Sequence, residues 1–293
     1  MLNMSDPKRH HILPIRYQTG FAIPDGRVWV EDRRRGVIAC EHPKRVAAEN
    51  YFYTSESPDS PNPAIMESFL ADNVEGPFWP VLDLLERREI PTTTERDRIA
   101  IFAAFLLTRV AAFRDVLTKV LGDVMLASQN LGSTINSIDG LLKISSGGIF
   151  IPAMPKNNAL YQMGHLGIEA SKILITLNTH LMYSTGDEPF ITSDNPFVFE
   201  RMVNDNQAPS VSATSFMKWI PLSAKVAVGF GFPGNHITVT NMESLKVRQT
   251  NIRFATAARR ILIAQSRKQL EQILSAIPKE VPKSAASFPS VVS

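Results

Sequence analysis

Two short runs rich in Val, Ile and Trp lie near the start of the chain, at residues 27–32 and 36–40. β-Branched and aromatic residues are typical of strands, and two such runs joined by a short polar link predict a β-hairpin. The link is the triple arginine at 33–35. We interpret it as a solvated hairpin tip, with a phosphate-binding patch as the alternative.

Helical patterns then dominate the middle of the chain. Residues 64–75 and 78–88 form one helical stretch, which we expect Pro77 to kink or break because proline has no backbone N–H donor. The sequence Thr-Thr-Thr-Glu at 92–95 fits a capping box, which begins a helix that extends to about Phe113.

A long amphipathic helix is predicted farther along, because apolar residues recur at helical spacing from Leu160 to Leu181. After it the pattern changes to short apolar runs that are typical of strands, at residues 190–191, 197–199, 219–222, 226–230 and 237–240. A helix from about Met242, a strand at 260–264 and a last helix at 267–277 complete the pattern.

Strands at both ends of a helical middle predict the α+β class rather than alternating βαβ units. We expect a mostly antiparallel sheet made from the N-terminal hairpin and the strands after residue 190, packed with the helical middle segment. Residues 1–277 are predicted to form a single domain. Residues 278–293 are rich in proline and serine and have little periodicity, which predicts a disordered tail.

Composition narrows the function only slightly. The 31 basic and 28 acidic residues give a net charge of +3, too small to indicate nucleic-acid binding by charge alone. The one cysteine, Cys40, excludes a disulfide within the chain and follows an apolar run, as a buried structural thiol would. The N-terminus lacks the apolar core of a signal peptide, and the longest apolar run, 99–107, is too short to span a membrane. We therefore expect a soluble, cytoplasmic protein without membrane partners.

Familiar catalytic motifs are absent or lack their context. The glycines of Gly229-Phe-Gly-Phe-Pro-Gly234 have the spacing of a dinucleotide-binding loop, but a strand pattern follows where that loop needs a helix. We interpret the segment as a glycine-rich hairpin turn. No H-E-x-x-H or C-x-x-C zinc motif is present, so the sequence leaves metals and cofactors open.

Two polar features stand out against this background. Arg109 is the only charged residue between Ile99 and Phe113. Because an unpaired buried charge is very costly, we predict that Arg109 is buried and paired with Glu67, Glu75 or Asp194.

Asp194 belongs to the second feature, the segment Thr-Ser-Asp-Asn-Pro at 192–196 between two apolar strand runs. Asp and Asn before proline favour a tight turn whose side chains bond their own backbone. A carboxylate at the end of a strand is also a place where a functional site could form.

The opening box His11-Ile-Leu-Pro14, with Tyr17 and Phe21 downstream, resembles the start of a bacterial family known as domain of unknown function 4238. The resemblance extends over most of the chain, although Gln18 replaces an apolar residue of the family and residues 133–155 have no clear match. Other positions that look like recurring family positions are Glu67, Glu75, Arg109, the box at 191–196, Pro221-Leu222 and Asn251.

The resemblance implies no reaction, but it draws attention to scattered polar residues that would form a site if they converged: His11, Glu67, Glu75, Arg109, Asp194 and Asn251. One hypothesis is a hydrolase or nuclease-like enzyme acting on a phosphate ester. His11 would be the general acid or base, Glu75 and Asp194 would orient it or hold a divalent ion, and Arg109 would stabilise anionic charge.

The alternative hypothesis is a non-catalytic component of a bacterial defence or toxin system that binds nucleic acid or a nucleotide. The same residues would then form a structural network. A third hypothesis is a purely structural subunit. A shared cavity beside three or more of these side chains would favour a site, and a dry network would favour a structural role.

Overall fold

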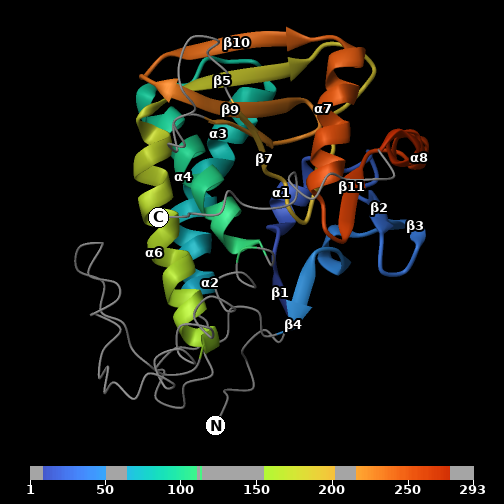
Figure 1. Ribbon diagram of the computed structural model, residues 1–293, viewed down its shortest axis with the longest axis horizontal. Coiled ribbons are helices and arrows are strands. Elements are labelled where there is room, and N and C mark those ends of the chain that lie inside the picture. The colour runs from blue at the N-terminus through green and yellow to red at the C-terminus, as the bar shows by residue number, and fades with distance from the viewer. Residues whose placement is uncertain (1–8, 51–64, 111–112, 114–154, 202–215, 278–293) are drawn as a thin grey trace.

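The computed structural model describes residues 9–50, 65–110, 113, 155–201 and 216–277 of the 293-residue chain (Figure 1). These residues form helices and two larger sheets, which confirms the α+β class. The prediction of a disordered tail concerns residues 278–293, which lie outside the described residues.

The larger sheet has five strands in the order β10-β5-β9-β8-β7. All neighbours are antiparallel except β10 and β5, which run parallel. The strands are β5 (Leu177–Ser184), β7 (Val198–Arg201), β8 (Phe216–Pro221), β9 (Val226–Pro233) and β10 (Ile237–Met242). Since β5 lies between β9 and β10, these two strands do not pair and the predicted glycine-rich hairpin turn is wrong. Strand β9 contains the predicted strand 226–230 and continues to Pro233.

The smaller sheet has four strands in the order β3-β2-β11-β6, all antiparallel. They are β2 (Val28–Asp32), β3 (Val37–Glu41), β6 (Thr192–Ser193) and β11 (Ile261–Ala264). The N-terminal hairpin is confirmed, and it shares a sheet with strands after residue 190, as expected. The remaining strands after residue 190 form the separate five-stranded sheet. A short pair, β1 (Arg9–His11) and β4 (Ala48–Asn50), lies outside both sheets.

The helices of the middle segment follow the predicted pattern with one refinement. Pro77 does not break the first stretch. Residues 71–75 form a π-helix, and Pro77 lies in the first turn of the α-helix that follows. A proline at the start of a helix costs little because its missing N–H would have no partner within the helix. The capping box between Thr92 and Glu95 is confirmed. These helices are α2 (Ile65–Leu70), the π-helix η2 (Ala71–Glu75), α3 (Gly76–Glu86), α4 (Thr93–Arg109) and α6 (Pro155–Ile175).

The predicted helix from Leu160 to Leu181 ends early. Helix α6 stops at Ile175, and Leu177 and Leu181 belong to strand β5. Residues four apart share a face in a helix and also in a strand, so the leucine spacing fits both structures. Leu177 and Leu181 adopt the strand conformation because β5 forms hydrogen bonds with β9 on one side and with β10 on the other.

The shorter helices flank the sheets: α1 (Ile15–Thr19), the 3-10 turn η1 (Pro43–Arg45), α7 (Ser244–Ala257) and α8 (Arg267–Ala276). Arg33 of the predicted solvated tip donates to the carbonyls of Ala255 and Ala258 at the end of α7, so this arginine is anchored, while Arg34 and Arg35 are exposed. Cys40 is half-buried rather than buried.

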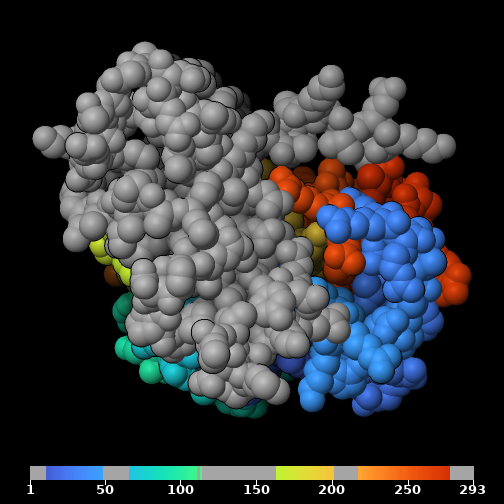
Figure 2. Space-filling view, turned by 90° about the horizontal axis from the view of Figure 1, so that it is seen from below, coloured from blue at the N-terminus to red at the C-terminus, as the bar shows by residue number. Residues whose placement is uncertain are grey.

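Buried apolar side chains from both ends of the chain form one cluster. Figure 1 shows the helices α3, α4 and α6 below the five-stranded sheet, and the four-stranded sheet to their right. In Figure 2 the N-terminal atoms in blue and the C-terminal atoms in orange and red lie side by side, as the pairing of β2 with β11 requires. Among the described residues, no helix combines the length and apolarity needed to cross a membrane.

Candidate functional site

Arg109 and Glu75 form a buried ion pair, which confirms the prediction for Arg109. The Arg109 residue is 6% exposed. Its Nη1 lies 2.5 Å from Oε1 of Glu75, the last residue of the π-helix, and its Nη2 donates to the backbone carbonyl of His11 at 2.9 Å. The guanidinium therefore ties α4 to the π-helix and to the end of β1.

Among the described residues, the hollow beside this pair is small. His11 supplies its backbone carbonyl, and Glu67 lies half-buried on α2. The hollow next to Arg109, lined also by Met66 and Phe105, measures about 10 Å³, roughly the space that one water molecule needs. This part of the predicted cluster has the geometry of a structural network.

Asp194 lies in a different place, at the end of β6. Its Oδ1 accepts the backbone N–H of Arg259 at 3.0 Å, and its Oδ2 accepts that of Arg260 at 2.9 Å. Burial raises the pKa of the Asp194 carboxyl, and these N–H donors act in the opposite direction. The predicted tight turn with Asp194 and Asn195 bonded to their own backbone is wrong, because both side chains bond distant backbone groups, and Asn195 Nδ2 donates to the carbonyl of Ala257 at 3.0 Å. The local bond comes from Ser193, whose Oγ accepts the N–H of Asn195 at 3.1 Å. Asp194 thus joins this segment to the link between α7 and β11.

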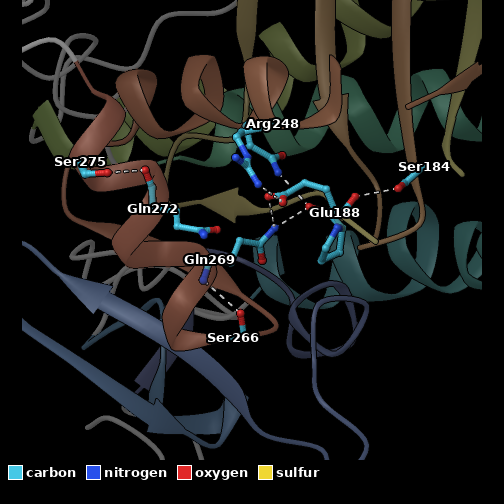
Figure 3. A network of polar contacts seen from close by, with 9 residues as sticks. Ser184, Glu188, Arg248, Ser266, Gln269, Gln272 and Ser275 are labelled. Carbon is cyan, nitrogen blue, oxygen red and sulfur yellow. Dashed lines mark hydrogen bonds and ion pairs between the residues drawn. The ribbon is translucent and has the colours of Figure 1, made fainter. Parts of the chain in front are cut away.

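Asn251 belongs to a third place, a network of polar contacts around residues 188–191. Its Oδ1 accepts the N–H of Ile191 at 3.1 Å, and its Nδ2 donates to the carbonyl of Pro189 at 2.8 Å. Gln269 on α8 donates to the same carbonyl and to Glu188, which is also paired with Arg248 on α7 (Figure 3). The network connects α7 and α8 to the chain that leads into β6.

A pocket of about 250 Å³ lies elsewhere, between the five-stranded sheet and α7. Its lining combines apolar and polar side chains, which is the usual construction of a small-molecule site. The apolar lining residues are Met182, Val198, Trp219, Met242 and Phe254, and the polar ones are His180, Glu200, Thr240, Lys246, Thr250 and Arg253.

The indole of Trp219 is fixed in this pocket. On the neighbouring strand, Gly229 has no side chain, and the six-membered ring of Trp219 fills the space that a Cβ would occupy. The indole Nε1–H donates to Oε2 of Glu200 at 3.2 Å, and Arg253 Nη1 donates to the same oxygen at 2.9 Å. The pocket therefore presents an aromatic ring that is held by its Nε1–H and by its contact with Gly229.

His180 adds an imidazole to the same pocket. Its Nδ1 lies 2.6 Å from the hydroxyl oxygen of Thr238, and its Nε2 is buried without a well-formed hydrogen bond among the described residues. Burial lowers the pKa of His180, while the nearby carbonyl of Gly231 acts to raise it. The lowered pKa favours the neutral imidazole at pH 7, in which one ring nitrogen is a donor and the other an acceptor.

Comparison with known families gives one match. The family model of DUF4238, described as a protein of unknown function, matches residues 9–268. The chain belongs to the DUF4238 family. Neither curated proteins nor solved structures yield a match to this chain.

The DUF4238 match covers the Arg109–Glu75 pair, Asp194, Asn251 and the pocket alike. The pocket residues come from β5, β7, β8, β10 and α7, and the order of these strands in the sheet differs from their order in the chain. Sequence reasoning therefore missed them. The detectable signal was Gly229 inside an apolar run, since a glycine within a strand marks the close approach of another group.

Proposed function

We propose that this DUF4238 protein binds a ligand that contains a nucleobase in the pocket between the five-stranded sheet and α7. The observation that carries the proposal is the fixed indole of Trp219. Proteins often bind bases by stacking them on an aromatic side chain, a contact worth roughly 1–3 kcal/mol per base. Because Trp219 is held before a ligand arrives, little conformational entropy is lost on binding.

The groups beside the indole favour a base over a purely apolar ring. Thr240 has a hydroxyl, and Glu200 has carboxylate oxygens that accept hydrogen bonds. A nucleobase is a planar ring with donors and acceptors along its edge. Its faces match the apolar lining of the pocket, and its edge matches these polar groups.

Binding has more support than hydrolysis of a phosphate ester by His11, Glu75, Arg109 and Asp194. Asp194 has both carboxylate oxygens bonded to backbone N–H groups. Arg109 is bonded to Glu75 and to the His11 carbonyl, beside a hollow of about 10 Å³. These contacts favour the structural role for that network.

Tryptophan fluorescence tests the proposal. The chain has three tryptophans, and we expect nucleosides added to the purified protein to quench part of the signal in a saturable way. Trp219→Leu should remove the response and lower affinity about 10- to 100-fold, the equivalent of one stacked base. Trp29 and Trp79 remain as reporters of a folded chain. A Trp219→Leu protein that binds nucleosides as tightly as the wild type contradicts the proposal.

A further inference from the structure

The α7 side of the pocket carries two cations on one face. Lys246, Thr250 and Arg253 all line the pocket, and their spacing of four and three residues places them in a row along the helix. With a rise of 1.5 Å per residue, Lys246 and Arg253 are about 10 Å apart along the axis. The row lines the α7 side of a cavity whose other walls include Met182, Val198 and Trp219.

Glu200 is the one acidic residue that lines the pocket within the described ranges, and its Oε2 is already shared. Glu200 Oε2 accepts from both Trp219 and Arg253. Lys246 is exposed and has no ion-pair partner within the described part of the chain. With His180 favoured in its neutral form by its lowered pKa, the two cations exceed the one carboxylate. An anionic ligand would balance this charge.

We infer that the ligand is a nucleoside diphosphate, whose base stacks on Trp219 and whose phosphates lie along the row from Lys246 to Arg253. This inference rests on the proposed function, since the base must occupy the pocket for the phosphates to reach the row. Phosphate oxygens accept charge-assisted hydrogen bonds from both side chains. Arg253 then exchanges Glu200 for phosphate, while Glu200 keeps its bond to the indole.

The length of the row favours two phosphates over one. A single phosphate contacts one end of a row about 10 Å long, whereas a diphosphate extends farther along it and meets both cations. Thr250 lies between them and donates its hydroxyl proton to the Lys246 carbonyl at 3.0 Å, so it contributes little to phosphate binding. We therefore expect affinity to rise from nucleoside to monophosphate to diphosphate.

Isothermal titration calorimetry with adenosine and guanosine and their mono- and diphosphates tests the inference on the full-length protein. For the preferred base, the diphosphate should bind about tenfold or more tightly than the nucleoside, the gain expected from a new charge-assisted hydrogen bond. Lys246→Ala should remove most of this gain, so that the diphosphate and the nucleoside bind with similar affinity. Lys268→Ala, which removes an exposed lysine of α8, is the matched control and should change neither affinity.

Glu200→Gln provides a second variant that does not depend on removing a cation. Glutamine keeps an oxygen to accept the Trp219 N–H but no longer competes for Arg253 as a charge, so the ratio of diphosphate affinity to nucleoside affinity should increase. Equal affinity of nucleoside and diphosphate in the wild type overturns the inference and leaves the proposed function intact. Tighter binding of a single-stranded oligonucleotide than of the diphosphate also overturns it. If no nucleoside or nucleotide binds, the proposed function fails as well.

Discussion

The indole of Trp219 occupies the space that a Cβ atom on Gly229 would need. A Cβ at this position would lie 2.3 Å from Cζ3 and 2.4 Å from Cε3 of the ring. Real Cβ atoms do not approach other atoms so closely, so an alanine here must push the ring away. The shape of the pocket thus depends on one missing methyl group in β9.

Gly229→Ala should therefore lower both stability and nucleobase affinity. Overpacking typically costs about 1–3 kcal/mol of unfolding free energy, and the displaced indole no longer presents a fixed stacking face. Thermal melting and fluorescence titration measure the two effects. Adding Trp219→Leu to Gly229→Ala should restore part of the stability without restoring binding. If the single variant melts and binds like the wild type, the contact does not shape the pocket.

Removing either partner of the Arg109–Glu75 pair should be strongly destabilising. The two side chains are 8% and 18% exposed, and breaking a buried pair typically costs about 3–5 kcal/mol because one charge stays buried alone. Arg109→Lys should also be harmful, since lysine cannot bond Glu75 and the His11 carbonyl in the same fork. Urea unfolding of Arg109→Ala, Glu75→Ala and the double variant measures the coupling.

The exposed pair between Arg16 and Asp83 is the matched control for that experiment. Its side chains are 51% and 54% exposed, and pairs of this kind contribute about 0–1 kcal/mol. We expect Arg16→Ala to have a small effect, although Arg16 also lies over the ring of Trp79. Similar losses for Arg16→Ala and Arg109→Ala would argue against a special role for the buried pair.

Lys218, on the opposite face of β8 from Trp219, should make stability depend on alkaline pH. Burial lowers the pKa of Lys218 from 10.5 to about 8. Between these values the unfolded chain keeps a proton that the folded protein has lost, so the free energy of unfolding rises with pH in this window.

Lys218→Met should accordingly raise the melting temperature at pH 7 and flatten the profile between pH 8 and 10. The exposed Lys225 on the neighbouring turn is the control, and Lys225→Met should keep the wild-type profile. A Lys218→Met protein that is less stable than the wild type at pH 7 would show that the charge is well compensated in the folded state.

Asn251→Asp should destabilise the protein even though the change is nearly isosteric. The amide group of Asn251 donates to the Pro189 carbonyl and accepts from the Ile191 N–H. A carboxylate keeps the second bond but faces the carbonyl with an oxygen, and such a buried mismatch costs about 1–3 kcal/mol or more. Asn73→Asp, at an exposed amide on the π-helix, serves as the comparison in the same denaturation series.

The sequence predicted the features that depend on local chemistry. The capping box at Thr92 and Glu95 needs only neighbouring residues. Arg109 was predicted to pair because its own helix offers no carboxylate, and Glu75 lies on the preceding helical segment, where short connections make contact favourable. Both inferences use the energy of isolated polar groups and do not require the three-dimensional arrangement of the chain.

Features that depend on strand order could not be predicted in this way. The sequence predicts a helix at Leu177 and Leu181 because their spacing fits the repeat of a helix as well as that of a strand. Only the pairing of β5 with β9 and β10 determines that these residues form a strand. The pocket requires Trp219 to lie over Gly229, ten residues later in the chain, and this contact depends on the register between β8 and β9. Asp194 was ambiguous because its partners, Arg259 and Arg260, are distant in sequence.

The bond from Arg260 to Asp32 joins positions 228 residues apart, and it lies where β11 completes the sheet that the N-terminal hairpin begins. During synthesis on the ribosome, the edge of β2 that pairs with β11 stays unpaired until almost the whole protein has been made. Unfilled strand edges promote association with other chains, and contacts of high sequence separation form slowly. We expect nascent or truncated chains that end before Ile261 to need chaperone protection and to aggregate without it.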